Sequence, residues 1–175
     1  MSDPFAGDAF STPLAVEERE GLRLSWITYR HELNDAEQRN IALAAAWAQR
    51  ARRVEILSES FVRALHRRMF GDVWSWAGSY RTTARNLGVD AWRIPTEVRA
   101  VLDDARYWLD HGTYGDDEIA VRLHHRLVFV HPFPNGNGRH ARLMADLLIV
   151  RRGGQRFTWG RAGLGQPGDA RTEYI

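Results

Sequence analysis

The sequence predicts an all-α protein, a helical bundle that carries one small β-hairpin. Long stretches repeat their apolar residues at helical spacing, and residues with capping side chains precede several of them. Only residues 80–94 combine β-type composition with the absence of a helical period. The chain has 175 residues, of which 44% are hydrophobic, enough for one globular domain with a packed core.

The predicted elements begin with a short N-terminal helix and a long Ala-rich one. Pro13 suits the first turn of the short helix, and Gly21 can end it. Asn34, followed three residues later by Glu37, is close to a capping box for the stretch 36–57. The good helix formers in that stretch predict a helix throughout.

A third helix is predicted between Ser58, a suitable cap, and Gly71. Residues 80–94, rich in Thr, Gly and aromatic side chains, predict a turn-bounded β-hairpin. Further helices are expected at 96–111, 116–130 and 138–152. We therefore divide the chain into an N-terminal segment (1–33), a core (34–152) and a C-terminal loop with the start of a helix (153–175).

The composition excludes several classes of function. The chain has no Cys, which rules out disulfides and thiolate chemistry. No stretch is long and apolar enough to span a membrane, and the N-terminus lacks a signal pattern, so we expect a soluble, cytoplasmic protein. All 24 basic residues are Arg, but no basic run is long enough to predict direct nucleic-acid binding.

Residues 131–142, HPFPNGNGRHAR, place small and polar groups between two apolar helices. Gly136 and Gly138 allow backbone N–H groups just before a helix N-terminus to approach an anion closely. Arg139 and Arg142 lie three residues apart in the first turns of that helix and suit a polyphosphate.

The other end of this stretch supplies a candidate base. His131 could take a proton from an incoming hydroxyl, and Phe133 is expected to anchor the loop in the core. The pattern is neither a Walker loop, since GK[ST] is missing, nor a Rossmann fingerprint, since no strand precedes it. The residues predict a nucleotide-phosphate cradle beside a general base.

This stretch closely resembles the signature of the Fic family, HxFx[D/E]GNGRxxR. WAGSYR at 76–81 resembles the family segment before its flap hairpin, and HHRLVFVHPF resembles the helix that leads into the motif. The chain as a whole resembles the small bacterial branch called mobile mystery protein B, over most of residues 10–175. The resemblance implies the Fic fold and transfer of AMP from ATP to a hydroxyl of a target protein, with Mg²⁺.

The family roles fall on residues of the motif. By resemblance, His131 is the general base, and Asn137 and the amides of Gly136 and Gly138 hold the phosphates. Arg139 contacts the phosphates near the transferred group, and Arg142 the terminal phosphate. The 80–94 hairpin is the flap, which aligns a target segment by strand addition.

One motif position departs from the family pattern. The acidic metal ligand is replaced by Asn135, whose amide oxygen can coordinate Mg²⁺ but brings no charge. The resemblance also implies autoinhibition by a helix with the pattern [S/T]xxxE[G/N], whose Glu pairs with Arg142. Glu20 fits the end of this pattern, with Val16 at the Ser/Thr position. Glu32 is a weaker rival, and a separate antitoxin-like partner is a further alternative.

Two other functions stay open from the sequence. A Fic-like module could bind nucleotide or protein without turnover. A cluster of histidines could hold a transition metal, although no HExxH pattern accompanies it. These histidines are His124, His125, His131 and His140.

Overall fold

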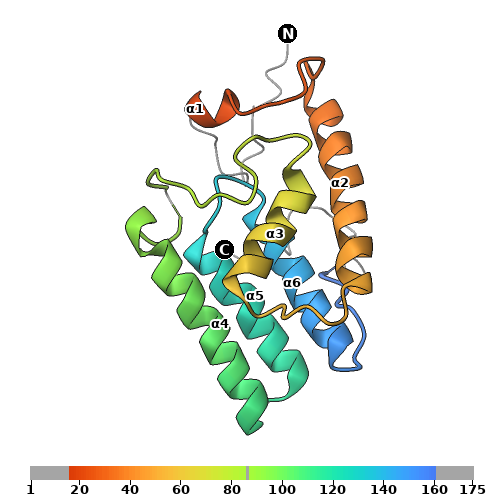
Figure 1. Cartoon of the computed structure of the whole chain (residues 1–175), viewed down its shortest axis with the longest axis vertical. Helices are drawn as coiled ribbons and strands as arrows, with labels where there is room; N and C mark the ends of the chain where they lie inside the picture. Colours follow the sequence, from red (N-terminus) through yellow and green to blue (C-terminus); the bar gives the residue numbers. More distant parts are fainter. Residues whose placement is uncertain (1–15, 86, 161–175) are drawn as a thin grey trace.

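The computed structural model describes residues 16–85 and 87–160, which form a bundle of α-helices (Figure 1). The helices are α1 (Val16–Arg19), α2 (Arg30–Arg50), α3 (Glu59–Phe70), α4 (Ile94–His111), α5 (Asp116–Val130) and α6 (Asn137–Arg151), with a 3₁₀ turn η1 (Ala91–Arg93) before α4. Neither described range contains a β-strand, so the all-α prediction is confirmed and its hairpin is not.

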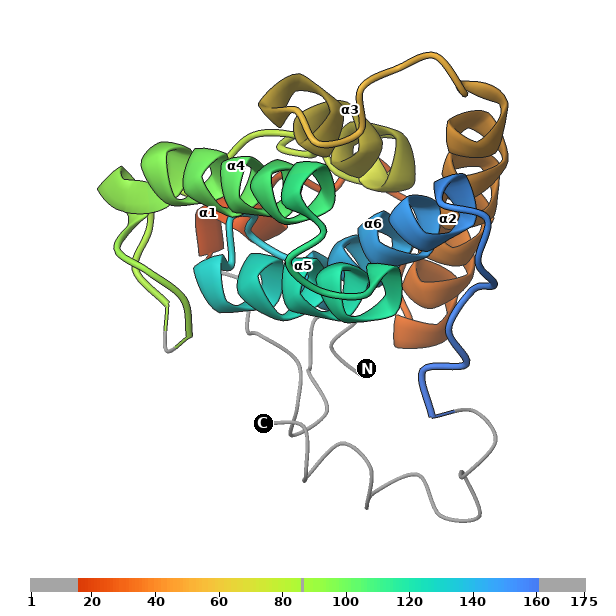
Figure 2. The same cartoon turned by 90° about the horizontal axis from the view of Figure 1, so that it is seen from below.

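The helices surround α6 and α3. Helix α5 packs between α4 and α6, while α3 contacts α2, α4 and α6 (Figures 1 and 2). The predicted apolar face of α3 is buried in this core. Helix α6 is buried at nine of its positions and so has neighbours on most sides. The N-terminal end of this enclosed helix carries the motif.

Most helix ends follow the sequence signals. Ser58 caps α3, because its side chain accepts a hydrogen bond from the N–H of Phe61 at 3.2 Å. Gly112 ends α4 in the left-handed conformation at φ 58°. The predicted limits of α5 and α6 agree with the structure to within one residue.

Helix α2 differs at both ends from the prediction. It begins at Arg30, because the Glu32 carboxylate accepts hydrogen bonds from the N–H groups of Thr28 and Tyr29 and so forms the capping box earlier. It ends at Arg50 instead of continuing to residue 57. The Arg151 side chain donates to two backbone carbonyls in the turn that follows, including that of Ala51 at 2.8 Å.

Residues 80–85 and 87–90, together called the 80–90 loop, form no strand, and the predicted hairpin is wrong for these described residues. The guanidinium group of Arg81 takes the place of a strand ladder. It donates to the carbonyl of Thr83 at 2.8 Å and to that of Val89, which joins the two arms of the loop. Its Nε donates to the carbonyl of His131 at 2.7 Å. A side chain thereby satisfies carbonyls that backbone N–H groups would satisfy in a hairpin.

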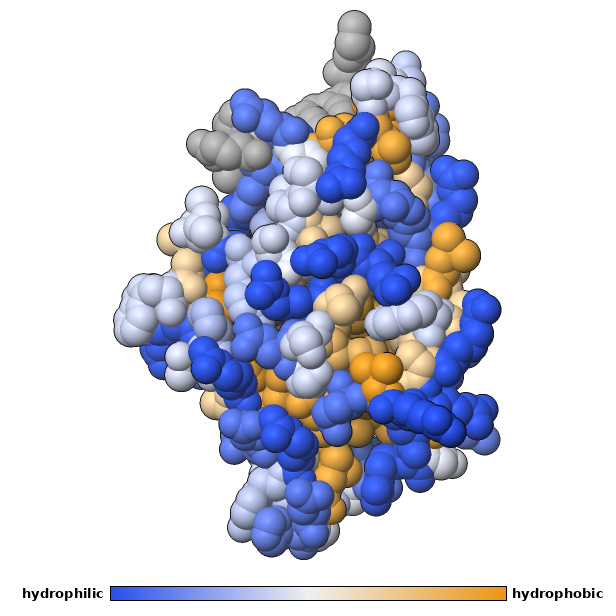
Figure 3. All heavy atoms as spheres, in the orientation of Figure 1, coloured by the Kyte–Doolittle hydropathy of each residue, from blue (hydrophilic) through white to orange (hydrophobic). Residues whose placement is uncertain are grey.

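The face of the molecule shown in Figure 3 is mostly hydrophilic, and its apolar areas lie among hydrophilic side chains. Within the described ranges, no helix combines the length and the hydropathy that crossing a membrane requires.

We expect Arg81→Lys to lower the free energy of unfolding by about 2–3 kcal/mol. Arg81 is 3% exposed, and a single ammonium group cannot reach all three carbonyls, so at least one buried acceptor loses its partner. Urea unfolding followed by circular dichroism measures this. Arg93→Lys, in an exposed ion pair with Glu97, is the control and should change stability by less than about 0.5 kcal/mol.

Candidate functional site

The motif forms a tight loop between the end of α5 and the start of α6. His131 ends α5 with a left-handed backbone at φ 53°, which turns the chain sharply. Gly136 precedes α6 at φ 78°. A Cβ at Gly136 would lie 2.5 Å from the Phe70 ring, so only glycine fits between the loop and α3.

The buried imidazole of His66, on α3, holds this loop in place. Gly78 donates its backbone N–H to Nδ1 at 3.0 Å, which leaves the proton on Nε2. Nε2 lies 3.0 Å from the carbonyl oxygen of Asn135 and donates to it. Burial, followed by the nearby His140, lowers the pKa of His66 and keeps the ring neutral.

Phe133 is fully buried, as the sequence predicts for the anchor of the loop. Its ring stacks on His66 with a centroid distance of 3.7 Å. Asn137 closes the loop, because its side-chain oxygen accepts from the N–H of Phe133 at 2.9 Å and its Nδ2 donates to the Phe133 carbonyl at 2.8 Å. The side chain of Asn137 is thus engaged within the loop, and the expectation that Asn137 helps to hold the phosphates stays a prediction.

The start of α6 keeps the features of an anion site. The first backbone N–H groups of a helix have no partner within it and carry a partial positive charge. A Cβ at Gly138 would meet no atom of the described residues within 4 Å, so they leave the space beside this residue open. The backbone N–H groups of Asn137 and Gly138 are thus suited to an anion, whereas that of Gly136 donates to Oδ1 of Asn135 at 2.6 Å. The phosphate site at these residues stays a prediction.

His131 is buried, with 7% of its surface exposed. Nδ1 lies 3.4 Å from the carbonyl oxygen of Val128, and donation to this oxygen leaves the lone pair on Nε2. Burial lowers the pKa of His131, and the positive charges of Arg81 and Arg85 lower it further. The ring is therefore neutral at pH 7 and can accept a proton.

The 80–90 loop lies directly against the motif. The N–H of Arg81 donates to the carbonyl of Pro132 at 2.9 Å, and that of Val89 to the carbonyl of Val130 at 3.4 Å. A Cβ at Gly88 would lie 2.6 Å from the Cβ of His131. The loop thus covers one side of the candidate base, where the sequence predicts a flap.

The two motif arginines extend in different directions. Arg139 donates from Nη1 to Glu37 of α2 at 2.6 Å and lies 4.8 Å from the centroid of the Phe70 ring. Arg142 is exposed, and its charge acts on His124 of α5, whose pKa is lowered to about 4 chiefly by burial and then by Arg142. The motif therefore offers guanidinium groups on two sides of α6.

The structure offers no preformed metal centre in its described ranges. No group of three His, Asp or Glu that could hold a metal ion occurs there. His140 points away from the motif surface, since its Nε2 lies 3.0 Å from the carbonyl of Val62, and His125 is exposed. Asn135 directs its side-chain oxygen to the N–H of Gly136 at 2.6 Å.

The predicted inhibitory contact between Glu20 and Arg142 does not occur among the described residues. Helix α1 ends at Arg19, so Glu20 falls in the following turn and is exposed. Glu18 of this helix is buried and pairs with Arg85 of the 80–90 loop. The residues expected to start this helix, 12–15, lie outside the described ranges.

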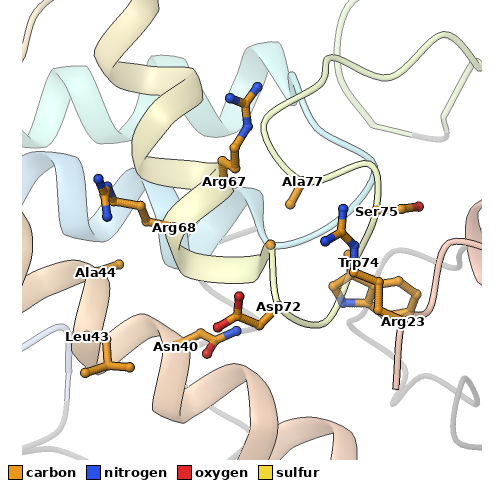
Figure 4. A pocket seen from close by; sticks show the side chains of 11 residues that line it. Arg23, Asn40, Leu43, Ala44, Arg67, Arg68, Asp72, Trp74, Ser75 and Ala77 are labelled. Carbon is orange, nitrogen blue, oxygen red and sulfur yellow. The ribbon is translucent and has the colours of Figure 1, made fainter. Parts of the chain in front are cut away.

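A groove of about 440 Å³ between α2 and α3 lies apart from the motif, because none of residues 131–142 lines it. Trp74 and Arg23 lie on one side of it, and Arg67 and Arg68 on another (Figure 4). The guanidinium groups of Arg67 and Arg68 point away from each other, so the groove does not gather them around one ligand.

Sequence reasoning missed the roles of His66, Arg81 and Glu37. Their partners in the motif are Asn135, His131 and Arg139, respectively, and each pair is more than 40 residues apart in the sequence. Arg81 does belong to the quoted WAGSYR segment, so a resemblance signalled it, while no local pattern signals the other two.

Comparison with known proteins gives a consistent result. The model of the Fic/DOC family matches residues 56–149. Protein adenylyltransferase fic-1 of Caenorhabditis briggsae is 41% identical over 93 residues, which are 51% of this chain and 18% of that protein. Protein adenylyltransferase Fic of Drosophila grimshawi is 28% identical over 126 residues, 70% of this chain and 26% of the relative. The chain thus spans about a quarter or less of the length of these curated relatives.

Solved structures have the same fold. Fic-1 from C. elegans superposes with a TM-score of 0.52 and 30% identity, covering 67% of this chain and 37% of that one. The N-terminal FIC domain of Bep8 from Bartonella sp. 1-1C gives a TM-score of 0.62, covering 74% and 70% of the two chains. At 17% identity, the second likeness shows the fold alone.

We expect acid to destabilise the protein partly through His140. Burial lowers the pKa of this residue from the ordinary 6.5 to about 4. Between these values the unfolded chain binds a proton that the folded chain does not, so stability falls as the pH drops through this window and is retained above it. The contribution of His140 is about 3 kcal/mol.

Urea unfolding at pH 7 and pH 4 tests this. His140→Gln keeps an N–H donor for the carbonyl of Val62 but cannot titrate. The loss of stability between the two pH values should therefore be smaller in this variant than in the wild type. Equal losses would show that His140 is accessible to protons in the folded state.

Proposed function

Because the chain belongs to the Fic/DOC family, we propose that it transfers AMP from ATP to a hydroxyl side chain of a target protein. The observation that carries the proposal is the position of a neutral imidazole, His131, at the loop that leads into the N-terminus of α6. In this proposal the imidazole accepts the proton of the target hydroxyl, and the helix N-terminus binds the phosphates of ATP. The curated relatives named protein adenylyltransferase support the same reaction.

In the proposed reaction, Nε2 of His131 removes the proton of the target hydroxyl. The hydroxyl oxygen forms a bond to the α-phosphorus of ATP, the bond from that phosphorus to the bridging oxygen breaks, and pyrophosphate leaves. The N-terminal amides of α6 stabilise the charge on the phosphates, together with Arg139 and Arg142. The fixed loop contributes positioning, because its donors need no rearrangement.

The 80–90 loop is the proposed place where the target segment docks. It lies against the motif through backbone hydrogen bonds at Arg81 and Val89, so its position relative to His131 is fixed. Fixing the target beside the base raises the effective concentration of its hydroxyl. Within this proposal the target protein is defined only by its accessible hydroxyl, and an antitoxin-like partner would act by covering the same face.

The residues of the motif fit a Mg²⁺ site poorly. Residues 131–142 contain no carboxylate, and the one candidate ligand, the side-chain oxygen of Asn135, already accepts a hydrogen bond from Gly136. We therefore assign no charged Mg²⁺ ligand to residues 131–142, and no step of the reaction above passes through one.

We expect His131→Ala to lower the rate of AMP transfer by about 10²–10⁴ and to leave the affinity for ATP nearly unchanged. Mass spectrometry of candidate targets, and of the protein itself, after incubation with ATP and Mg²⁺ measures transfer, while calorimetry measures binding. His125→Ala, at an exposed position on α5, is the matched control. Wild-type transfer by His131→Ala would remove the base from the mechanism.

The same assay separates the enzyme from its alternative, a module that binds nucleotide or protein without turnover. Such a module would bind ATP in both the wild type and His131→Ala, and would label no target in either. Labelling that depends on His131 contradicts the module.

We expect Asn135→Asp to tighten Mg²⁺ binding in the presence of ATP, because a carboxylate replaces a neutral amide oxygen. Calorimetric titration of Mg²⁺ into the ATP-bound wild type and variant compares the two affinities without requiring turnover. Equal or weaker Mg²⁺ binding by the variant would assign residue 135 a purely structural position in the loop.

A further inference from the structure

Glu37 is a buried carboxylate that reaches the motif from α2, about a hundred residues earlier in the chain. Its side chain is 6% exposed, and both oxygens have partners. Oε1 accepts from the indole N–H of Trp74 at 2.7 Å, and Oε2 accepts from Nη1 of Arg139 at 2.6 Å. A buried carboxylate needs such partners, because charge without them is costly to remove from water.

The other surroundings of Arg139 are equally defined. Phe70 lies under its guanidinium group at 4.8 Å from the ring centroid, and the same ring fills the space where Gly136 would carry a Cβ. The Phe70 ring thus packs against both the motif loop at Gly136 and the guanidinium group of Arg139. Within the described part of the chain, Glu37 is the only hydrogen-bond acceptor of Arg139, through Nη1 alone. The Nε and Nη2 donors remain for a ligand.

An arginine in this position faces two opposing effects from Glu37. The negative charge weakens the attraction of the guanidinium group for an anion. The hydrogen bond removes much of the rotational freedom that a long side chain would otherwise lose when it binds an anion. A phosphate is unable to displace the carboxylate cheaply, since Glu37 would then be left buried with Trp74 as its remaining partner. Glu37 therefore keeps its hold on Arg139 when an anion binds the outer edge of the guanidinium group.

We propose that Glu37 is a positioning residue, which holds the guanidinium of Arg139 on the Phe70 ring so that its outer edge receives a phosphate of the nucleotide. This inference rests on the function proposed above and adds a residue to it. Trp74 acts one step further away, because its indole N–H fixes the other oxygen of the same carboxylate.

The test measures phosphate binding without catalysis. Inorganic tripolyphosphate is titrated calorimetrically into the wild type, Glu37→Ala, Arg139→Ala and the double variant. We expect Glu37→Ala to weaken binding by about tenfold in the wild-type background. In the Arg139→Ala background, the same change should have less than a twofold effect, because Glu37 acts through Arg139.

Other outcomes overturn the inference. Equal weakening in both backgrounds would mean that Glu37 only supports the fold, and unchanged or tighter binding by Glu37→Ala would mean that its charge competes with phosphate. Absence of tripolyphosphate binding in the wild type would also reject it. Glu97→Ala, which breaks an exposed ion pair on α4, should bind like the wild type.

Two further measurements keep the test decisive. If Glu37→Ala unfolds, Glu37→Gln preserves the volume of the side chain and one acceptor oxygen, and should show a smaller effect with the same dependence on Arg139. Transfer of AMP is assayed separately on the same proteins. If AMP is transferred but the effect of Glu37→Ala on tripolyphosphate binding does not depend on Arg139, only the role of Glu37 is contradicted. If that dependence is found but no AMP is transferred, only the proposed reaction is contradicted.

Discussion

A single neutral imidazole, that of His66, joins α3 to two other segments, the turn at Gly78 and the motif loop. It accepts the N–H of Gly78, donates to the carbonyl of Asn135, and stacks on Phe133. Because one ring nitrogen accepts and the other donates, protonation would break one of these hydrogen bonds. The ring sits where water cannot replace either partner, so the loop that precedes α6 depends on this contact for its position.

Other buried side chains hold the rest of the site in the same way, by hydrogen bonds to the backbone or to one charged side chain. Arg81 satisfies the carbonyl of His131, and Asn137 satisfies both polar groups of the Phe133 backbone. Each replaces regular secondary structure where the chain must bend. Such contacts fix a site tightly, because a buried polar group that loses its partner cannot form a replacement hydrogen bond with water.

Helices could be predicted from the sequence because their signals are local. Ser58, Gly112 and the apolar face of α3 lie within one or two turns of what they determine. The motif and its family resemblance identified the candidate base and the helix N-terminus for the same reason. The hairpin prediction failed because amino-acid composition gives only a preference for β structure. The hydrogen bonds from Arg81 to the carbonyls of Thr83 and Val89 determine the conformation of this segment instead. Contacts such as that of Glu37 with Arg139 cross a hundred residues and leave no pattern in either neighbourhood.

The position of Gly88 beside His131 has a consequence for the shape of whatever reaches the ring. The loop occupies the space next to the Cβ of His131, and the residue is only 7% exposed. In the reaction proposed above, a hydroxyl on a flat protein face would meet the loop before it reached Nε2. A hydroxyl on a thin, projecting segment would reach the ring more easily, so crowding around the proposed base would select targets by the shape of their surface.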